Sequence, residues 1–305
     1  MNRKEWLAKR IELENSFIKR LPFGKRFLKT YDIFHILVLI FYFLLKITFI
    51  AKIGIKNSLK LKIKKFTHNI PKLPDGLKGL TILHLSDLHL DESINTKDIL
   101  SKKLKDISEV DLIVMTGDYA SSSITDKTII QDTVDQIAII LKNIKSKYGV
   151  YAVLGNHDGH LLVEPLEAIG VRVLVNEYND LKINNDDLRI IGTDDVNSFY
   201  TKRASEVLTH ARNKFSICLV HSPDIFEEAS MKGADLYLCG HTHGGQICLP
   251  GGIPLISHTS VSRRYTKGLW YYGNMIGYTS SGVGISAVPL RYNSRPEIII
   301  HTLSK

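Results

Sequence analysis

Residues that bind metals through oxygen or nitrogen follow five apolar segments of this chain. One segment ends at Cys239 and leads into Gly240-His241-Thr242-His243. The other four lead into residues of the same kinds, which are Asp87 with His89, Asp118, Asn156 with His157 and Asp158, and His221. Carboxylate, imidazole and amide ligands in this mixture suit manganese, iron or zinc. There are more candidates than one ion needs, so the sequence favours two ions that share a carboxylate.

A pair of metal ions has a well-defined use in phosphoryl chemistry. Two cations about 3.5–4 Å apart lower the pKa of a water and stabilise the oxygens of an in-line displacement at phosphorus. The residue types therefore predict hydrolysis of a phosphodiester or a pyrophosphate.

The spacing of apolar residues predicts how these side chains are positioned. From Gly79 onward strand-like segments alternate with helical patterns, which we expect at 95–109, 126–146, 161–168, 202–213 and 224–232. Further strands are expected at 171–175, 181–193, 276–284 and 297–303, without helices between all of them, so the sheets should be mixed. In such α/β domains the carboxyl ends of the strands carry the chemistry.

The N-terminal quarter differs in composition from the rest of the chain. Residues 1–80 hold 18 Lys and Arg against 5 Asp and Glu, whereas the remainder holds 22 against 26. A positive charge confined to one end argues against a nucleic-acid groove across the main domain and favours a surface for anionic lipids. We expect a division into residues 1–70, a basic and hydrophobic membrane-associating segment with a linker, and residues 71–305, the catalytic domain.

Two stretches of this quarter favour membrane attachment. Residues 1–31 have apolar side chains at helical spacing, interrupted near Pro22 and Gly24. Residues 33–51 include only His35 and Lys46 as basic or acidic members, and nineteen such residues approach the length of a bilayer core. No small-residue cleavage site follows, so a signal peptide is a poor fit. The alternative is a helix packed on the domain, and whether the stretch spans or lies on the membrane stays open.

Three cysteines, Cys218, Cys239 and Cys248, show no paired spacing. We expect no disulfide framework and a reducing compartment. Together with the basic segment, this predicts a membrane-associated protein that faces the cytoplasm.

In chain order the five motifs are Asp-x-His, Gly-Asp, Gly-Asn-His-Asp, a lone His and Gly-His-x-His. In this order they resemble the motifs of the calcineurin-like metallophosphoesterase family over about residues 80–303. The resemblance implies a four-layer α/β/β/α sandwich, here preceded by the N-terminal membrane-associating helical segment, and two divalent metal ions. Mn²⁺ is the first expectation for both ions, with Fe²⁺ or Zn²⁺ as alternatives. The implied ligands are Asp87, His89 and His243 for the first metal, Asp118 as the bridge, and Asn156, His221 and His241 for the second.

The same resemblance assigns the catalytic pair. His157 matches the histidine that contacts phosphate and protonates or stabilises the leaving oxygen, with Asn156 beside it in the substrate site. Asp158 matches a carboxylate that orients this imidazole. Every motif position is occupied, which argues against the alternative of a non-catalytic membrane scaffold.

Downstream segments resemble the membrane-associated bacterial branch of the family. They include Gly244-Gly245-Gln246, Ser281-Gly282-Val283-Gly284 and Pro289-Leu290-Arg291-Tyr292. That branch contains a UDP-2,3-diacylglucosamine pyrophosphatase of lipid A biosynthesis, so the expected reaction converts this substrate to 2,3-diacylglucosamine 1-phosphate (lipid X) and UMP. We expect Arg291 either to contact the substrate phosphate or to form a structural ion pair with Glu297. The alternative is a tethered phosphoesterase that acts on another soluble or lipid substrate.

Other polar residues near the motifs have simpler interpretations. His84 is expected to be a packed core histidine, and His160 either contacts substrate or lies on the surface. Asp194 and Asp195 resemble a loop of the family or are turn residues.

Overall fold

A computed structural model describes residues 3–20, 42–46, 50–92, 95–107, 109–121, 126–257 and 259–305. Most of the apolar stretch 33–51 lies outside these ranges, so the membrane-attachment prediction rests on residues that the structure largely does not describe. Within the described ranges, no helix combines the length and the apolar character needed to cross a bilayer.

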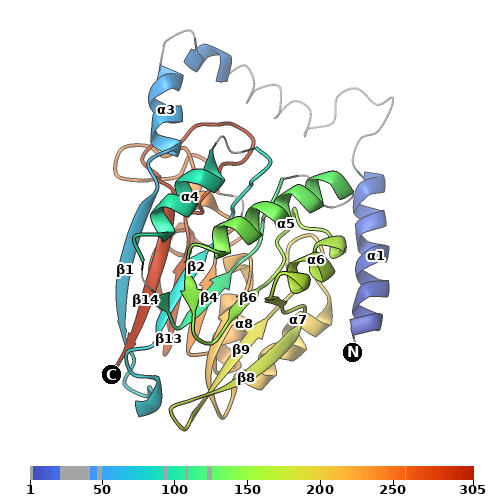
Figure 1. Ribbon diagram of the computed structural model, residues 1–305, viewed down its shortest axis with the longest axis vertical. Coiled ribbons are helices and arrows are strands. Elements are labelled where there is room, and N and C mark those ends of the chain that lie inside the picture. Colours follow the sequence, from blue (N-terminus) through green and yellow to red (C-terminus); the bar gives the residue numbers. More distant parts are fainter. Residues whose placement is uncertain are drawn as a thin grey trace.

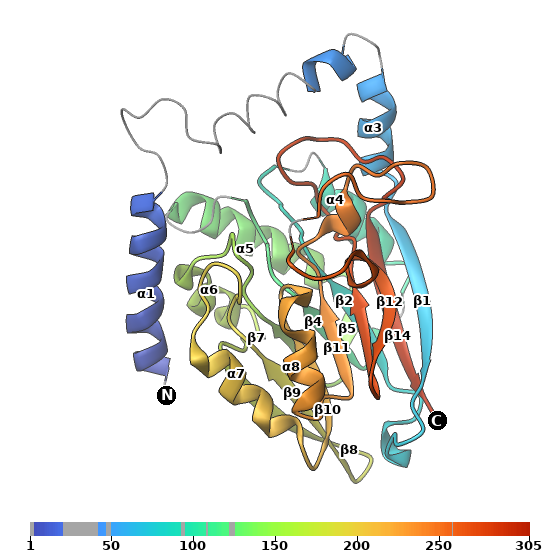
Figure 2. The same ribbon diagram turned by 180° about the vertical axis from the view of Figure 1, so that it is seen from behind.

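Two mixed six-stranded sheets form the centre of the molecule (Figures 1 and 2). The first sheet has the order β1 (Lys62–Asn69), β14 (Glu297–Ser304), β2 (Thr81–Leu85), β4 (Leu112–Met115), β6 (Val150–Ala152) and β7 (Val171–Val173). The second has the order β12 (Gly268–Tyr272), β13 (Met275–Thr279), β11 (Leu236–Cys239), β10 (Phe215–Leu219), β9 (Asp186–Gly192) and β8 (Glu177–Ile183). A small parallel pair joins β3 (Glu109–Val110) to β5 (Lys145–Ser146).

Both sheets are parallel at their centres and antiparallel at a few joins. Strands β2, β4, β6 and β7 pair in parallel, as do β9, β10, β11 and β13. The antiparallel joins are β14 with β2, β12 with β13, and β8 with β9. Strands β4, β10 and β11 are buried along their whole length, which explains their continuous apolar sequences.

Helices cover the outer face of each sheet. Helices α4 (Thr96–Leu104), α5 (Lys127–Leu141) and α6 (Val163–Ala168) share an apolar core with the first sheet. Helices α7 (Lys202–Leu208) and α8 (Phe226–Met231) share another with the second sheet. A third core lies between the sheets. The architecture is therefore α/β/β/α, and Figure 2 shows α7 and α8 on the face opposite to α4, α5 and α6.

Some elements differ from the sequence-based expectation. The strand expected over 181–193 is a hairpin of β8 and β9, because Asn184 and Asn185 both adopt positive φ, at 46° and 73°. Two such residues form the type of turn that matches the twist of paired strands. The helix expected over 202–213 ends as α7 at Leu208 and continues as a 3₁₀ turn, Thr209–Ala211.

The N-terminal quarter contributes to the sandwich. The edge strand β1 lies on the N-terminal side of the division expected at residue 70, yet it pairs with β14 over eight residues. Its lysines suit an edge, where charge discourages pairing with other chains. Helix α3 (Ile50–Ser58) precedes it, and helix α1 (Arg3–Arg20) lies along the edge of the domain beside α6 and α7 (Figures 1 and 2).

Candidate metal centre

The candidate ligands follow strands of both sheets. In the first sheet Asp87, Asp118 and Asn156 follow β2, β4 and β6, which are parallel neighbours. In the second sheet His221 follows β10 and His241 follows β11, which are also parallel neighbours. The carboxyl ends of both sets converge at one edge of the sandwich, as the α/β topology predicts.

Two groups of side chains there could each hold a metal ion. Asp87, His89 and His243 form the first group, in which one donor atom of each residue lies within 4.8 Å of the others. Asp118, His221 and His241 form the second by the same measure. The resemblance implied the same three residues as ligands of the first metal, whereas Asp118, which it implied as the bridge, is grouped here with His221 and His241.

Donor atoms lie close together within each group, and one carboxylate lies near both groups. In the first, His89 Nε2 lies 3.2 Å from His243 Nε2. In the second, His221 Nε2 lies 3.2 Å from Asp118 Oδ2 and 3.1 Å from His241 Nδ1. The Asp118 Oδ2 atom is also 3.8 Å from His89 Nε2, so one carboxylate oxygen faces a histidine of each group.

Asn156 lies beside the second group. Its Oδ1 atom is 3.2 Å from His221 Nε2, and its side chain is half-buried. An amide oxygen at this place can complete the second metal's donor set.

Five of the candidate ligands have a left-handed backbone. Their φ angles are 50° at Asp87, 41° at His89, 56° at Asp118, 69° at His241 and 51° at His243. Such conformations cost about 1–3 kcal/mol each and persist where the surroundings enforce them, commonly at functional sites. Here the Asp87 amide donates to the Gly117 carbonyl, and the His89 amide donates to the Asp118 carbonyl.

Two glycines allow the chain to approach the carboxylates. A Cβ atom on Gly240 would lie 2.2 Å from Asp87 Oδ2 and 1.9 Å from Ser86 Oγ. A Cβ atom on Gly155 would lie 2.1 Å from Asp118 Oδ1. Neither position tolerates a side chain without moving a ligand.

Burial and mutual charge decide the protonation of the site. Burial lowers the pKa of His89 to about 3 and also lowers that of His243, so both imidazoles are neutral at pH 7, as metal ligation requires. Burial opposes the charge on His221 as well, but the Asp118 carboxylate outweighs it and raises the pKa of His221 to about 10. The donor set of imidazoles and carboxylates fits divalent cations of the manganese, iron or zinc type, and a cation held here would displace the proton from His221.

Hydrogen bonds orient the ligands from behind. His221 Nδ1 lies 2.7 Å from the Thr116 carbonyl, and His89 Nδ1 lies 2.6 Å from Ser121 Oγ. Because the other nitrogen then faces the ligand groups, these contacts set both ring orientations.

A polar chain leads from Asp87 into the core. Ser86 Oγ donates to Asp87 Oδ2 at 2.6 Å, and Thr116 Oγ1 donates to Ser86 Oγ at 2.7 Å. The hydroxyl hydrogen of Thr116 is thereby used, so His84 Nε2, 2.9 Å away, must donate to Thr116 Oγ1. His84 is a fully buried core histidine that takes part in this chain.

This series of hydrogen bonds continues from His84 through two more histidines. His301 Nε2 lies 3.4 Å from His84 Nδ1, and His68 Nε2 lies 2.8 Å from His301 Nδ1. His68 Nδ1 ends the chain, without a hydrogen-bond partner among the described residues. Burial lowers the pKa of His84 to about 3 and that of His68 to about 4, so both imidazoles are neutral at pH 7.

The catalytic pair differs in part from its expected arrangement. His157 lies at the site, with its amide donating to Asp118 Oδ1 at 3.0 Å and its Nδ1 atom 3.0 Å from the Ser121 carbonyl. The Asp158 carboxylate was expected to orient this imidazole. It instead accepts hydrogen bonds from the backbone amides of Asp118, Tyr119 and Gly155, because it is buried beneath the loop that carries His157.

Arg291 is fully buried behind the first ligand group. Its guanidinium donates to the carbonyls of His243 and Gly284, and Nη2 lies 3.3 Å from His243 Nδ1. Glu297, the alternative partner, forms its ion pair with Lys64. The contacts of Arg291 therefore support His243 and its loop, which differs from the expected contact with substrate phosphate.

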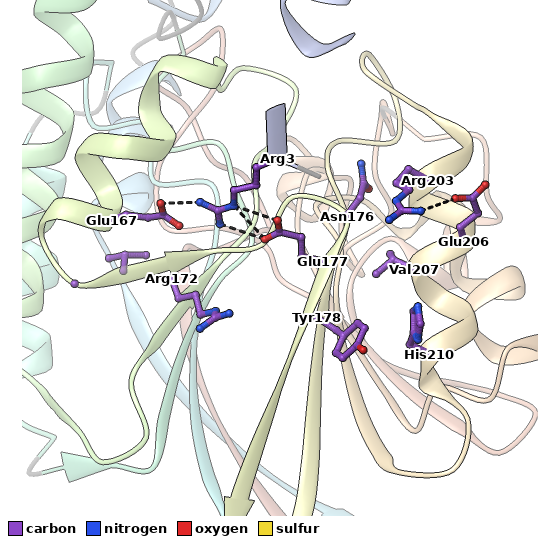
Figure 3. A pocket seen from close by; sticks show the side chains of 12 residues that line it. Arg3, Glu167, Arg172, Asn176, Glu177, Tyr178, Arg203, Glu206, Val207 and His210 are labelled. Atoms are coloured by element: carbon purple, nitrogen blue, oxygen red, sulfur yellow. Dashed lines mark hydrogen bonds and ion pairs between the residues drawn. The ribbon is translucent and has the colours of Figure 1, made fainter. Parts of the chain in front are cut away.

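A pocket of about 710 Å³ lies apart from this centre, and none of the predicted site residues lines it. Figure 3 shows Arg3 of α1 between Glu167 and Glu177, with Arg203 paired to Glu206 on the other wall. Because Arg3 and Arg203 are paired with carboxylates there, the pocket does not offer these two cations to an anion.

Comparison with known proteins agrees with this geometry. The family model "Calcineurin-like phosphoesterase" matches residues 80–245. The metallophosphoesterase YkoQ of Bacillus subtilis is 34% identical in an alignment of 242 residues that covers 75% of this chain and 86% of that protein. The phosphodiesterase YaeI of Escherichia coli is 31% identical over 244 residues, covering 76% of this chain and 84% of that protein.

A metallophosphoesterase of Campylobacter jejuni is 29% identical over 294 residues, covering 92% of this chain and 73% of that protein. This chain belongs to the calcineurin-like phosphoesterase family. It is a metal-dependent phosphoester hydrolase.

Sequence reasoning missed the residues that support the ligands. Ser86, Thr116 and Ser121 are common polar residues, and no local pattern distinguishes them. Asp194, expected as a family-loop or turn residue, binds Trp6 and Arg10 of the distant helix α1. Only the packing of remote segments reveals these contacts.

Proposed function

We propose that this protein is a phosphodiesterase with a dinuclear metal centre. The supporting observation is the Asp118 carboxylate, whose Oδ2 atom faces His221 of one ligand group and His89 of the other. The proposed ligands are Asp87, His89, Asp118, Asn156, His221, His241 and His243. Mn²⁺ is the proposed metal. The donors accept several divalent ions, and availability selects among them.

The protein's side chains divide the chemical work. The two cations, when bound, supply Lewis acidity to the phosphoryl oxygens and lower the pKa of the attacking water. His157 Nδ1 donates to the Ser121 carbonyl, because a carbonyl only accepts, so in the imidazolium form the proton on Nε2 is the one that can pass to the leaving oxygen. The buried carboxylate of Asp158 holds the backbone on which both Asp118 and His157 depend.

The proposed substrate is a phosphodiester or pyrophosphate with a lipid-linked or nucleotide group, with UDP-2,3-diacylglucosamine as the first candidate. The basic residues of the N-terminal quarter and the apolar stretch 33–51 support this choice, because they suit a membrane lipid surface as a partner. The proposed location is the cytoplasmic face of a membrane.

A direct assay tests the phosphodiesterase proposal. The full chain is stripped of metal, reloaded with Mn²⁺, and supplied with bis(p-nitrophenyl) phosphate. Hydrolysis should require the metal and fall about a thousandfold in His157→Ala if this residue is the general acid. His210→Ala, an exposed histidine of the 3₁₀ turn after α7, should keep wild-type activity. A metal-loaded protein without phosphodiesterase activity would refute the proposal.

A second assay tests the lipid substrate. Diacylated and deacylated UDP-glucosamine are compared at equal concentration in mixed micelles. The lipid proposal predicts a higher kcat/KM for the diacylated compound, whereas equal rates would favour a tethered enzyme for soluble phosphoesters.

A further inference from the structure

The buried face of helix α1 carries charge. Arg10 and Glu14 are 1% and 3% exposed, whereas Leu7 and Ile11 on the outer face are 37% and 36% exposed. A helix that docks by hydrophobic burial has the opposite arrangement. Burying charged groups is costly unless they are paired and hydrogen-bonded. The contact between α1 and the domain is therefore directional.

Arg10 connects α1 to two loops of the domain, which contain residues 155–160 and 194–199. Its Nε atom donates to Glu14 Oε1 at 2.8 Å, Nη1 donates to Asp194, and Nη2 donates to the Asp158 carbonyl at 2.5 Å. The guanidinium carbon lies 3.6 Å from the centre of the Phe199 ring. A planar guanidinium with several donors suits such a junction.

Glu14 binds the same loop two residues further on. It accepts a hydrogen bond from the His160 amide at 2.8 Å, and its Oε2 atom lies 2.6 Å from His160 Nδ1. Burial opposes both charges, but their partners raise the pKa of Arg10 and lower that of Glu14, so both side chains stay ionised. Two ionised residues of α1 thus hold the loop of residues 155–160.

This loop also reaches the metal centre. The Asp158 side chain accepts from the amides of Asp118 and Gly155, and the His157 amide donates to Asp118 Oδ1. The path from α1 to the proposed bridging carboxylate is therefore short: Arg10 binds Asp158, which binds Asp118.

The beginning of α1 is fastened separately. Trp6 Nε1 donates to Asp194 Oδ2 at 2.7 Å. Arg3 forms ion pairs with Glu167 and Glu177, which Figure 3 shows at the side of the pocket. These contacts fix the first turns of α1 on the domain, so that Arg10 and Glu14 meet the loop of residues 155–160 in one position.

We propose that Arg10 and Glu14 are positioning residues for the loop of residues 155–160, which carries His157, so that docking of α1 controls the activity of the metal centre. This inference rests on the proposed phosphodiesterase function. Helix α1 lies outside the family match at residues 80–245, so the match assigns it no role. A directional ionic contact fits the purpose, because it fixes one position of the helix where an apolar face would permit several.

Substitutions at Glu14 test the proposal in the full chain. Glu14→Ala removes the carboxylate, and Glu14→Asp keeps its charge near Arg10 while withdrawing it from His160. Glu12→Ala is the matched control, because the Glu12 side chain lies on the same helix and is 68% exposed. The measurements are bound Mn²⁺, kcat and KM for bis(p-nitrophenyl) phosphate, and hydrogen exchange of residues 155–162.

We expect both Glu14 variants to bind Mn²⁺ as the wild type does. Their kcat should fall about tenfold with little change in KM, because a displaced loop no longer aligns His157. Exchange in residues 155–162 should become about tenfold faster, since the His160 amide loses its acceptor. Glu12→Ala should match the wild type in all three measurements.

Wild-type kcat in both Glu14 variants would overturn the proposal, even with faster exchange. If Glu14→Ala does not fold, Glu14→Asp decides by the same criteria. If the wild type hydrolyses no phosphodiester, the proposed function fails, and the exchange comparison alone decides whether α1 orders the loop.

Discussion

Asp118 Oδ2 lies 3.2 Å from His221 Nε2, although the two residues follow strands of different sheets. The metal centre therefore depends on the packing of one sheet against the other. Because each ligand group draws residues from both sheets, a change that shifts the two sheets relative to each other should pull both groups apart before it affects either sheet alone.

Asp118→Asn should lose most of the bound metal. The substitution removes the charge that faces both ligand groups, so the affinity of each cation falls and phosphodiesterase activity decreases about a thousandfold or more. Metal content by mass spectrometry and hydrolysis rates measure both effects. Asp106→Asn, an exposed aspartate after α4, is the control and should behave as the wild type. A fully loaded Asp118→Asn protein would contradict the bridging role.

Gly240→Ala should displace Asp87, because the new Cβ atom would overlap its carboxylate. We expect a large loss of Mn²⁺ affinity, measured by titration. Gly170→Ala is a useful comparison, since that glycine has open space around it but a φ of +87°. It should lower the free energy of unfolding by about 1 kcal/mol without affecting Mn²⁺ binding. Equal metal affinities in both variants would rule out the steric explanation.

Thr116→Val removes no proposed ligand yet should weaken metal binding. The hydroxyl of Thr116 donates to Ser86, which in turn donates to Asp87. Without the Thr116 hydroxyl, Ser86 is held less firmly, and the Asp87 carboxylate is then freer to rotate. Substitution of such supporting residues typically costs about 10- to 100-fold in metal affinity. Thr133→Val, at a buried threonine of α5, is the matched control. The prediction fails if the two valine variants bind Mn²⁺ equally well.

The buried histidines should make folding sensitive to acid. Burial lowers the pKa of His68 to about 4, whereas the pKa of a histidine in an unfolded chain is about 6.5. Between these values the unfolded chain binds a proton that the folded chain does not, so stability falls as the pH falls. One such group contributes a slope of up to about 1.4 kcal/mol per pH unit.

His68→Gln keeps a donor for His301 but cannot titrate. The pH dependence of its unfolding free energy, measured by urea denaturation between about pH 4.5 and about pH 6, should be shallower than that of the wild type by up to this amount. Equal slopes in the two proteins would show that His68 is protonated to the same extent in both states.

The strands of the site and the polar residues that follow them were predictable from the sequence. A buried parallel strand has a continuous apolar sequence, and the polar residues after it, such as Asp87 or His241, must lie at the edge of its sheet. The family resemblance carried by the five motifs then predicted which side chains meet, and the structure brings six of them together in two groups, with Asn156 beside the second.

The tertiary structure alone decided the environment of those ligands. The hydrogen bonds that Ser86 donates to Asp87 and that the Asp118 amide donates to the Asp158 carboxylate depend on atomic positions that no periodicity encodes. The contact of Arg10 with the Asp158 carbonyl joins residues 148 positions apart. Hydrophobic patterning predicts which face of an element is buried, but the partner of a buried charge depends on how distant segments pack.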